Sequence, residues 1–150
     1  PMPSALRHLT TRALILGASA LAAASVPHGA RAQEGGLTVE LNKMEAADAG
    51  GCRAYFLFRN ATGDAFQGFE MSLAILDGQG VIDSLLAIDA APLPVARTTL
   101  KLFEIPSLAC GDISEILLHD ITACQLQDAG AADCFDLVTL DSKAPAALVK

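Results

Sequence analysis

The sequence lacks most of the residues and motifs that catalysis and cofactor binding use. It has no tryptophan, one tyrosine and three histidines, and it contains no Gly-x-x-x-x-Gly-Lys, Gly-x-Ser-x-Gly or Cys-x-x-Cys pattern. These absences argue against a phosphate-binding loop, a nucleophile elbow, a thioredoxin-like motif and a zinc ribbon. Few aromatic rings also disfavour a sugar-binding cleft. Paired carboxylates for glycoside hydrolysis stay open, because spacing in sequence does not give spacing in the fold.

The first 32 residues have the three parts of a secretory signal peptide. Arg7 and Arg12 make a basic start, residues 13–26 are small or apolar, and residues 30–32 place alanines before a cleavage point. A retained anchor is the alternative, but the apolar run is shorter than the about 20 residues that a membrane helix needs. The arginines are not adjacent, which favours general export over the twin-arginine route. We predict a cleavable signal at residues 1–32, a periplasmic location of the Gram-negative type, and one domain at residues 33–150.

The mature chain is strongly acidic. Three of the ten Lys and Arg residues leave with the signal, so that seven basic residues face 17 acidic ones, a net charge of −10. Phosphate backbones and anionic lipid headgroups repel such a domain. We therefore expect no nucleic-acid partner and no direct membrane insertion after signal removal. Good solubility is the simplest interpretation of the acidity, and a cationic partner or a cation site is the alternative.

All four cysteines lie in the mature chain, and an even number in an exported protein predicts disulfides. Four cysteines allow three pairings, among which we favour Cys52 with Cys110 and Cys124 with Cys134. By the chain-entropy model the first bridge stabilises the fold by roughly 4 kcal/mol and the second by roughly 2.5–3 kcal/mol. Engaged in bridges, the thiols do not serve as nucleophiles.

Alternating side chains predict a central strand at residues 52–60. Cys52, Ala54, Phe56 and Phe58 would line its core face, because successive side chains of a strand point to opposite sides. Similar patterns predict six further strands, at residues 37–41, 69–76, 81–88, 97–105, 113–121 and 135–140. The segment 113–121 also fits a short helix, and residues 144–150 are expected to be a frayed tail.

Turn chemistry separates these strands. Asp77-Gly78 lies between two of them and predicts a hairpin, whereas a calcium loop would need carboxylates where Leu85 and Ile88 stand. Asn60 opens a tight turn, with a glycosylation sequon as the alternative reading. Seven short strands without a convincing helix in the mature chain predict an all-β fold, an immunoglobulin-like antiparallel β-sandwich of about seven strands that is stabilised by disulfides.

A family resemblance follows from these features. Cys52 before an aromatic strand that ends at Asn60, the Asp77-Gly78 turn, and a proline loop before Arg97 resemble the small immunoglobulin-like or fibronectin-like modules of bacterial exported proteins. The chain also looks like short secreted proteins of uncertain role with signal-sequence-domain names. The resemblance implies binding or support of other envelope components, such as complexes of the Tol and biopolymer-transport kind. No binding residue carries over from it.

Candidate catalytic and metal-binding residues are few. His119 is the one imidazole of the mature domain, and we expect it at the exposed rim of a sheet rather than in a Ser-His-Asp triad. A second set consists of carboxylates near the second cysteine pair, which a weak calcium ion could use: Asp128, Asp133, Asp136 and Asp141. A solvated acidic loop is the simpler interpretation, so we predict no metal and no cofactor.

The sequence therefore favours a non-enzymatic protein-interaction module, an accessory subunit of an envelope complex. Its expected contact surfaces are exposed sheet edges or the loop between Cys124 and Cys134. One alternative is an exported inhibitor that inserts this loop into a secreted hydrolase. Another is a carrier that holds a small ligand between its sheets.

Overall fold

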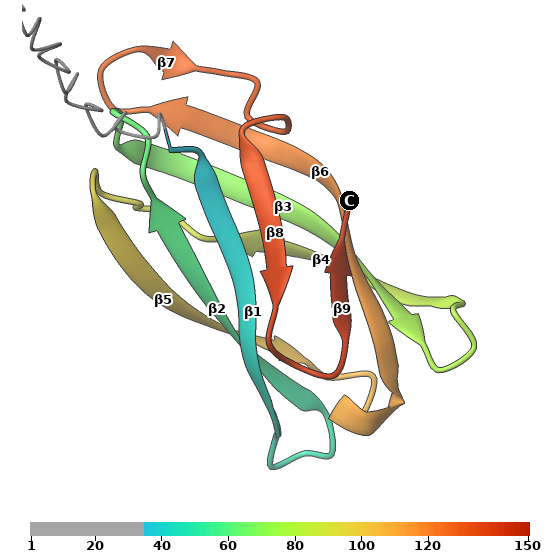
Figure 1. The fold of residues 1–150 in the computed structure, drawn as a ribbon. Helices are drawn as coiled ribbons and strands as arrows, with labels where there is room; N and C mark the ends of the chain where they lie inside the picture. The colour runs from blue at the N-terminus through green and yellow to red at the C-terminus, as the bar shows by residue number, and fades with distance from the viewer. Residues whose placement is uncertain (1–34) are drawn as a thin grey trace, which may run out of the picture. The chain divides into compact units, whose positions relative to one another are not determined.

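The computed structural model describes residues 35–150, which fold into two β-sheets (Figure 1). Sheet A has the strand order β5 (Arg97–Ile105), β2 (Cys52–Asn60), β1 (Leu37–Ala46) and β8 (Val138–Ser142). Sheet B has the order β4 (Ile82–Asp89), β3 (Phe66–Asp77), β6 (Ile113–Leu126) and β7 (Gly130–Ala131), and β9 (Ala147–Val149) also pairs with β6. The 3-10 turn η1 (Cys110–Asp112) precedes β6. The expected signal peptide, residues 1–32, lies outside the described residues.

The core lies between the two sheets, as expected for a sandwich. In β2 every second residue is buried, from Cys52 to Asn60, and the strand is paired on both sides, with β1 and β5. Phe58 of β2 packs edge-on against Phe69 of β3 with ring centroids 6.4 Å apart, and Phe69 packs in the same way against Phe66 at 5.7 Å. Aromatic rings therefore occupy the space in which a carrier would have to hold its ligand.

The two predicted disulfides are present. Cys52 at the start of β2 is bonded to Cys110 of η1, and Cys124 of β6 is bonded to Cys134 in the loop before β8. The first bridge spans 58 residues of sequence and the second spans 10. The Cys52–Cys110 bridge, which closes the longer loop, joins sheet A to the segment that leads into sheet B. It therefore connects the two layers covalently.

The predicted hairpin after Asp77 is also confirmed. The strands β3 and β4 pair antiparallel, and the Asp77 carboxylate accepts hydrogen bonds from the backbone N–H groups of Gln79 (2.9 Å) and Val81 (3.0 Å). Gly80 has a positive φ of 76°, which glycine adopts without steric cost. Asp77 therefore serves the turn, as the hairpin interpretation required.

Three expectations were wrong at the C-terminal end. The sandwich is not wholly antiparallel, because β8 pairs parallel with β1 and β9 pairs parallel with β6. The segment 144–150 is not a frayed tail: it contains β9, whose Leu148 is buried, and Lys150 donates hydrogen bonds to the carbonyls of Phe135 and Val138. The strand expected at 135–140 begins only at Val138, because residues 135–137 form a turn.

Three other strands are longer than expected. The strand β3 begins at Phe66 and ends at Asp77, whereas residues 69–76 were expected. The strand β1 continues to Ala46 because a bulge between Leu41 and Lys43 reverses which residues face the core, so the alternation breaks while the pairing continues. The strand β6 is longer than expected and reaches Leu126; the predicted loop after it contains the short strand β7.

Candidate functional site

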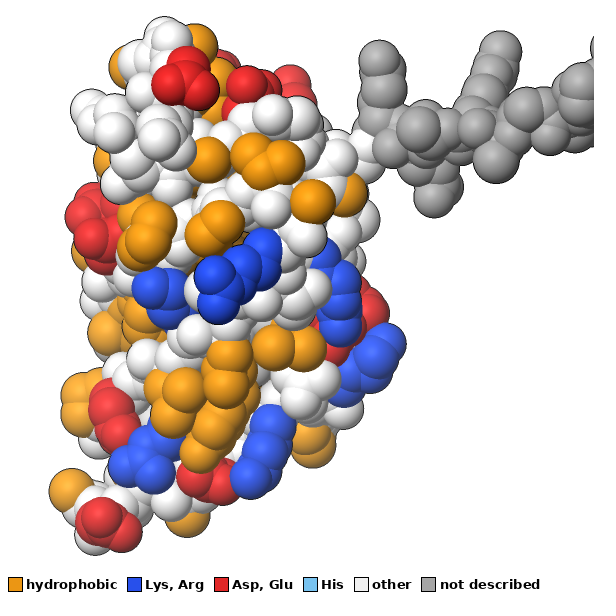
Figure 2. Space-filling view, turned by 90° about the vertical axis from the view of Figure 1, so that its left-hand side faces the viewer, with side chains coloured by type: hydrophobic (Ala, Val, Ile, Leu, Met, Phe, Trp, Pro, Cys, Tyr) orange, Lys and Arg blue, Asp and Glu red, His pale blue; other side chains and the backbone are white. Residues whose placement is uncertain are grey.

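Most of the exposed large apolar side chains belong to β4, β5 and the segments next to them, with Leu85 facing outward from sheet B and Leu100 and Leu102 facing outward from sheet A. Of the seven such side chains in residues 35–150, six lie on β4, on β5, in the turn before β4 or in the loop between the two strands: Val81, Ile82, Leu85, Val95, Leu100 and Leu102. The seventh is Leu137. Figure 2 faces the side on which β5 lies and shows a band of hydrophobic side chains with Lys and Arg side chains above and below it.

The densest part of this side is an apolar patch formed by Tyr55 and Leu57 of β2 with Leu100 and Leu102 of β5. Leu57 is paired with Leu100, and Tyr55 with Leu102, so the four side chains are direct cross-strand neighbours on the outer face of sheet A. The exposed fraction is 53% for Leu100 and 49% for Leu102, whereas Tyr55 and Leu57 are half-buried. No other part of residues 35–150 covers Leu100 and Leu102, so both side chains remain available for a contact with another molecule.

Ion pairs lie at both ends of the patch. At one end, Nε of Arg53 is 2.8 Å from the Glu104 carboxylate, and Glu45 accepts a hydrogen bond from the Tyr55 hydroxyl. At the other end, a nitrogen of the Arg59 guanidinium is 2.8 Å from the Glu40 carboxylate. The patch thus has an apolar centre and a polar rim, the arrangement that is typical of protein-binding surfaces.

Two carboxylates of this rim, Glu45 and Glu40, are held in their ionised form. The hydrogen bond from Lys43, followed by that from Tyr55, lowers the pKa of Glu45 to about 2. The pKa of Glu40 is lowered as well, chiefly by the hydrogen bond from Arg59 and then by that from Asn42. Glu40 points to the outer face, yet only 4% of its side chain is exposed. The rim therefore keeps its charges at neutral pH.

Charge is unevenly distributed between the two sheets. The strands of sheet A, with Lys143 directly after β8, carry six basic and four acidic residues, a net charge of +2. The rest of residues 35–150 carries one basic and twelve acidic residues, a net charge of −11. The apolar patch accordingly lies on the least acidic surface of an acidic protein.

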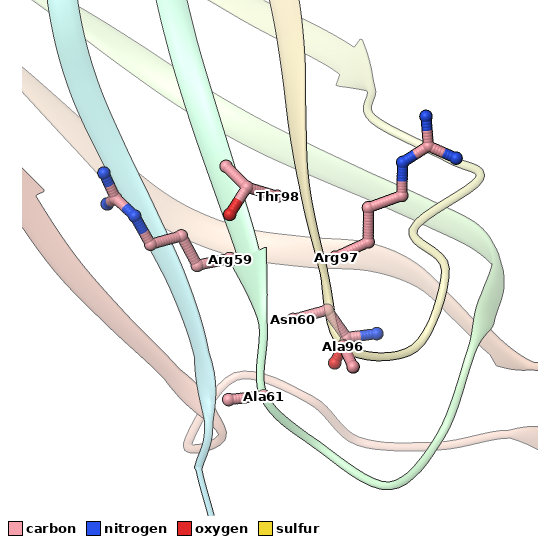
Figure 3. Close-up of a pocket in the computed structure, with 6 residues that line it drawn as sticks. All are labelled: Arg59, Asn60, Ala61, Ala96, Arg97 and Thr98. Carbon is pink, nitrogen blue, oxygen red and sulfur yellow. The ribbon is translucent and has the colours of Figure 1, made fainter.

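A shallow hollow of about 390 Å³ lies where β2 ends and β5 begins. It is lined by Arg59, Asn60, Ala61, Ala96, Arg97 and Thr98. Figure 3 shows that the guanidinium groups of Arg59 and Arg97 point away from each other, and Arg59 is already paired with Glu40. The two guanidinium groups therefore cannot bind the same anion. The hollow continues the patch but is not an anion-binding site.

Asn60 fixes the floor of this hollow. It is 3% exposed, and its Nδ2 donates to the carbonyls of Asp64 (2.8 Å), Leu93 (3.1 Å) and Pro94 (3.1 Å). Its Oδ1 accepts from the backbone N–H (3.0 Å) and the hydroxyl (2.6 Å) of Thr62. The turn predicted after residue 60 is confirmed, and the same side chain also holds the loop that leads into β5.

The catalytic and metal-binding candidates from the sequence do not come together in one site. His119 is exposed on β6, and no hydrogen bond joins its imidazole to a serine or a carboxylate of the described segment. Asp133 accepts a bond from the N–H of Phe135, and Asp141 is paired with Lys143. Within residues 35–150, no three His, Cys, Asp or Glu side chains are placed to hold a metal ion. The same residues contain no helix of the length and apolarity that a membrane span needs.

The sequence alone does not reveal the apolar patch. Alternation places Leu100 and Leu102 on one face of the strand and Phe103 on the other, so both faces carry large apolar residues and the pattern does not indicate which one is buried. A possible signal was the presence of large apolar residues on both faces of a strand that also contains Arg97 and Lys101. This combination is typical of an edge strand and not of a strand in the middle of a sheet.

No family model matches this sequence, and no curated protein matches it. The search of solved structures does give a match. The fold is similar to that of IrmA from Escherichia coli. The TM-score is 0.54 with 11% sequence identity, over 69% of this chain and 89% of the IrmA chain. At this identity the likeness to IrmA concerns the fold, and it supports the assignment of a small all-β module.

Proposed function

We propose that this protein is an exported, non-enzymatic binding module that contacts another protein through the apolar patch of Tyr55, Leu57, Leu100 and Leu102. In this proposal it resides in the periplasm and serves as an accessory subunit of an envelope complex, in keeping with its resemblance to immunoglobulin-like or fibronectin-like exported modules. Its two disulfides support an oxidising compartment, where such bonds persist.

One observation carries the proposal: Leu100 and Leu102 are about half exposed and adjoin Tyr55 and Leu57 on the outer face of sheet A. Binding surfaces bury a small apolar centre, and the polar groups around it exclude water. The ion pairs of Arg53 and Arg59 are placed to form such a rim beside Leu100 and Leu102. Sheet A carries a small positive net charge, whereas the rest of the domain is strongly acidic. An acidic partner is therefore repelled least at sheet A.

The inhibitor alternative receives less support. The loop between Cys124 and Cys134 is closed by a disulfide and by the pairing of β7 with β6, and residues 127–133 are exposed. These seven residues are Gln-Asp-Ala-Gly-Ala-Ala-Asp, however, and none is a large apolar or aromatic side chain. A loop that enters a hydrolase cleft needs an anchor residue of that kind.

The double substitution Leu100→Asp with Leu102→Asp tests the proposal. Tagged wild-type protein, purified under mild conditions from its native envelope, should carry a stoichiometric partner, and the double variant should lose at least nine-tenths of it. Two charges placed in the centre of an apolar contact would be desolvated without a counter-ion. The measurement is the molar ratio of partner to tagged protein.

Leu137→Asp is the matched control, because Leu137 is also exposed and apolar but lies outside the apolar patch. This variant should retain the partner. Both leucines of the patch are about half exposed, so the double variant should melt close to the wild-type temperature. Recovery of wild-type monomer alone, or equal loss of partner in the control, would count against the proposal.

A further inference from the structure

The strand β5 has one open edge. Within residues 35–150 it is the last strand of sheet A and pairs only with β2, through nine consecutive residue pairs without a register shift. The other end strand on this side, β4, has a shift against β3 near Ile82 and carries Asp83 and Asp89. Bulges and charges protect sheet edges from pairing, whereas a long regular edge is a template for another strand. Of these two edge strands, β5 is therefore the one that can pair with a strand of another molecule.

The two faces of β5 differ in character. Leu100 and Leu102 point to the outer face, and the alternation of a strand places Arg97 and Lys101 together on the opposite face. Neither cation pairs with a carboxylate within residues 35–150, although 16 acidic residues are present there. Instead, the Lys101 ammonium donates to the carbonyl of Ala91 at 2.9 Å. The edge strand thus presents apolar groups on one face and unpaired positive charge on the other.

We propose that β5 accepts an extended segment of the partner as a fifth strand of sheet A, and that this segment alternates apolar and acidic residues. Opposite residues of paired strands share a face, so apolar side chains of the segment would pack on Leu100 and Leu102. The intervening acidic side chains would then meet Arg97 and Lys101. Main-chain hydrogen bonds to the β5 edge would supply affinity, and the alternation would supply specificity. This inference rests on the proposed binding function.

The same charges disfavour a second copy of this chain as the occupant. In the antiparallel register that places Leu100 of one copy opposite Leu102 of the other, the two Lys101 side chains would face each other. Like charges directly opposite each other destabilise a strand pair. An inward-pointing lysine is also a common protection of an edge against self-pairing. An acidic segment would convert this protection into an attraction.

Two nine-residue peptides test the inference on the full disulfide-bonded chain. One peptide alternates valine with glutamate, and the other alternates valine with lysine. The whole protein is acidic, so its net charge favours the lysine peptide, and only a local site can reverse that order. We expect the glutamate peptide to bind at least tenfold more tightly and to slow hydrogen exchange of β5 amides at least tenfold, without a comparable effect on β4.

Charge reversal gives the matched comparison. Arg97→Glu with Lys101→Glu should reverse the preference between the peptides, whereas Lys143→Glu with Lys150→Glu, the same change in net charge away from β5, should preserve it. Equal or tighter binding of the lysine peptide, protection outside β5, or no binding of either peptide at millimolar concentration would overturn strand addition. So would a dimer whose β5 amides are protected without peptide. If the partner is still lost from the Leu100 and Leu102 variant, only strand addition fails and the proposed function stands.

Discussion

Replacing both Cys52 and Cys110 with alanine is expected to lower the stability of the oxidised protein by about 4 kcal/mol, which corresponds to a fall in melting temperature of about 15 °C. The bridge closes the longer of the two loops, 58 residues against 10, and so removes more conformational freedom from the unfolded chain. It also joins fully buried Cys52 of sheet A to the turn that enters β6. Thermal unfolding followed by circular dichroism measures the effect.

The second bridge supplies the control for this prediction. Replacing Cys124 and Cys134 together should cost less, roughly 2.5–3 kcal/mol, because the loop is short. Whole-domain stability is typically about 5–15 kcal/mol, so excess reductant, which opens both bridges, should bring the wild type close to unfolding. A melt that reductant leaves unchanged, or a larger loss from the short loop, would contradict the role given to the two bridges.

Replacing Asn60 with alanine is expected to destabilise the fold by about 2–3 kcal/mol. The substitution removes the donor to Asp64, Leu93 and Pro94, and it leaves the Pro94 carbonyl without the bond that the amide supplies. It also removes the acceptor of two bonds from Thr62. Buried polar groups that lose their partners cost more than the lost bond itself. Urea unfolding at neutral pH is the measurement.

Two neighbouring variants separate the functions of this side chain. Thr62→Ala removes one hydroxyl from the exposed part of the turn and should cost about 1 kcal/mol. Asn60→Asp keeps the acceptor but turns a carboxylate toward three carbonyl oxygens, so its loss should equal or exceed that of the alanine variant. A tolerated Asn60→Asp would mean that the bonds to Leu93 and Pro94 contribute little.

The sequence predicts the strands β2 and β5 well, because local chemistry determines their ends. The bounds of β2 and β5 agree with expectation: alternating residues run between Gly51 and the Asn60 turn in one case and between a proline loop and Pro106 in the other. The hairpin after Asp77 is also determined by local chemistry, because the Asp77 carboxylate accepts hydrogen bonds from N–H groups of the turn. The choice of strand over helix for the segment from Ile113 is confirmed as well.

Features that depend on distant partners were not accessible from the sequence. The strand β9 has only three residues, and it is a strand only because it pairs with the edge of β6. The bulge near Asn42 interrupts the alternation of β1, because the extra residue moves later side chains to the other face. The apolar patch depends on which face of β5 is covered by sheet B, and a strand with apolar residues on both faces does not reveal this.

The central claim is that this molecule acts by contact through the outer face of β5. Its most direct test introduces a photoreactive amino acid at Leu102, or at Leu137 as the control, in cells that export the full protein. Irradiation of the Leu102 variant should give one major covalent adduct with a single envelope protein, and irradiation of the Leu137 variant should not. Adducts that form from Leu137 but not from Leu102, or none from either position, would contradict the account.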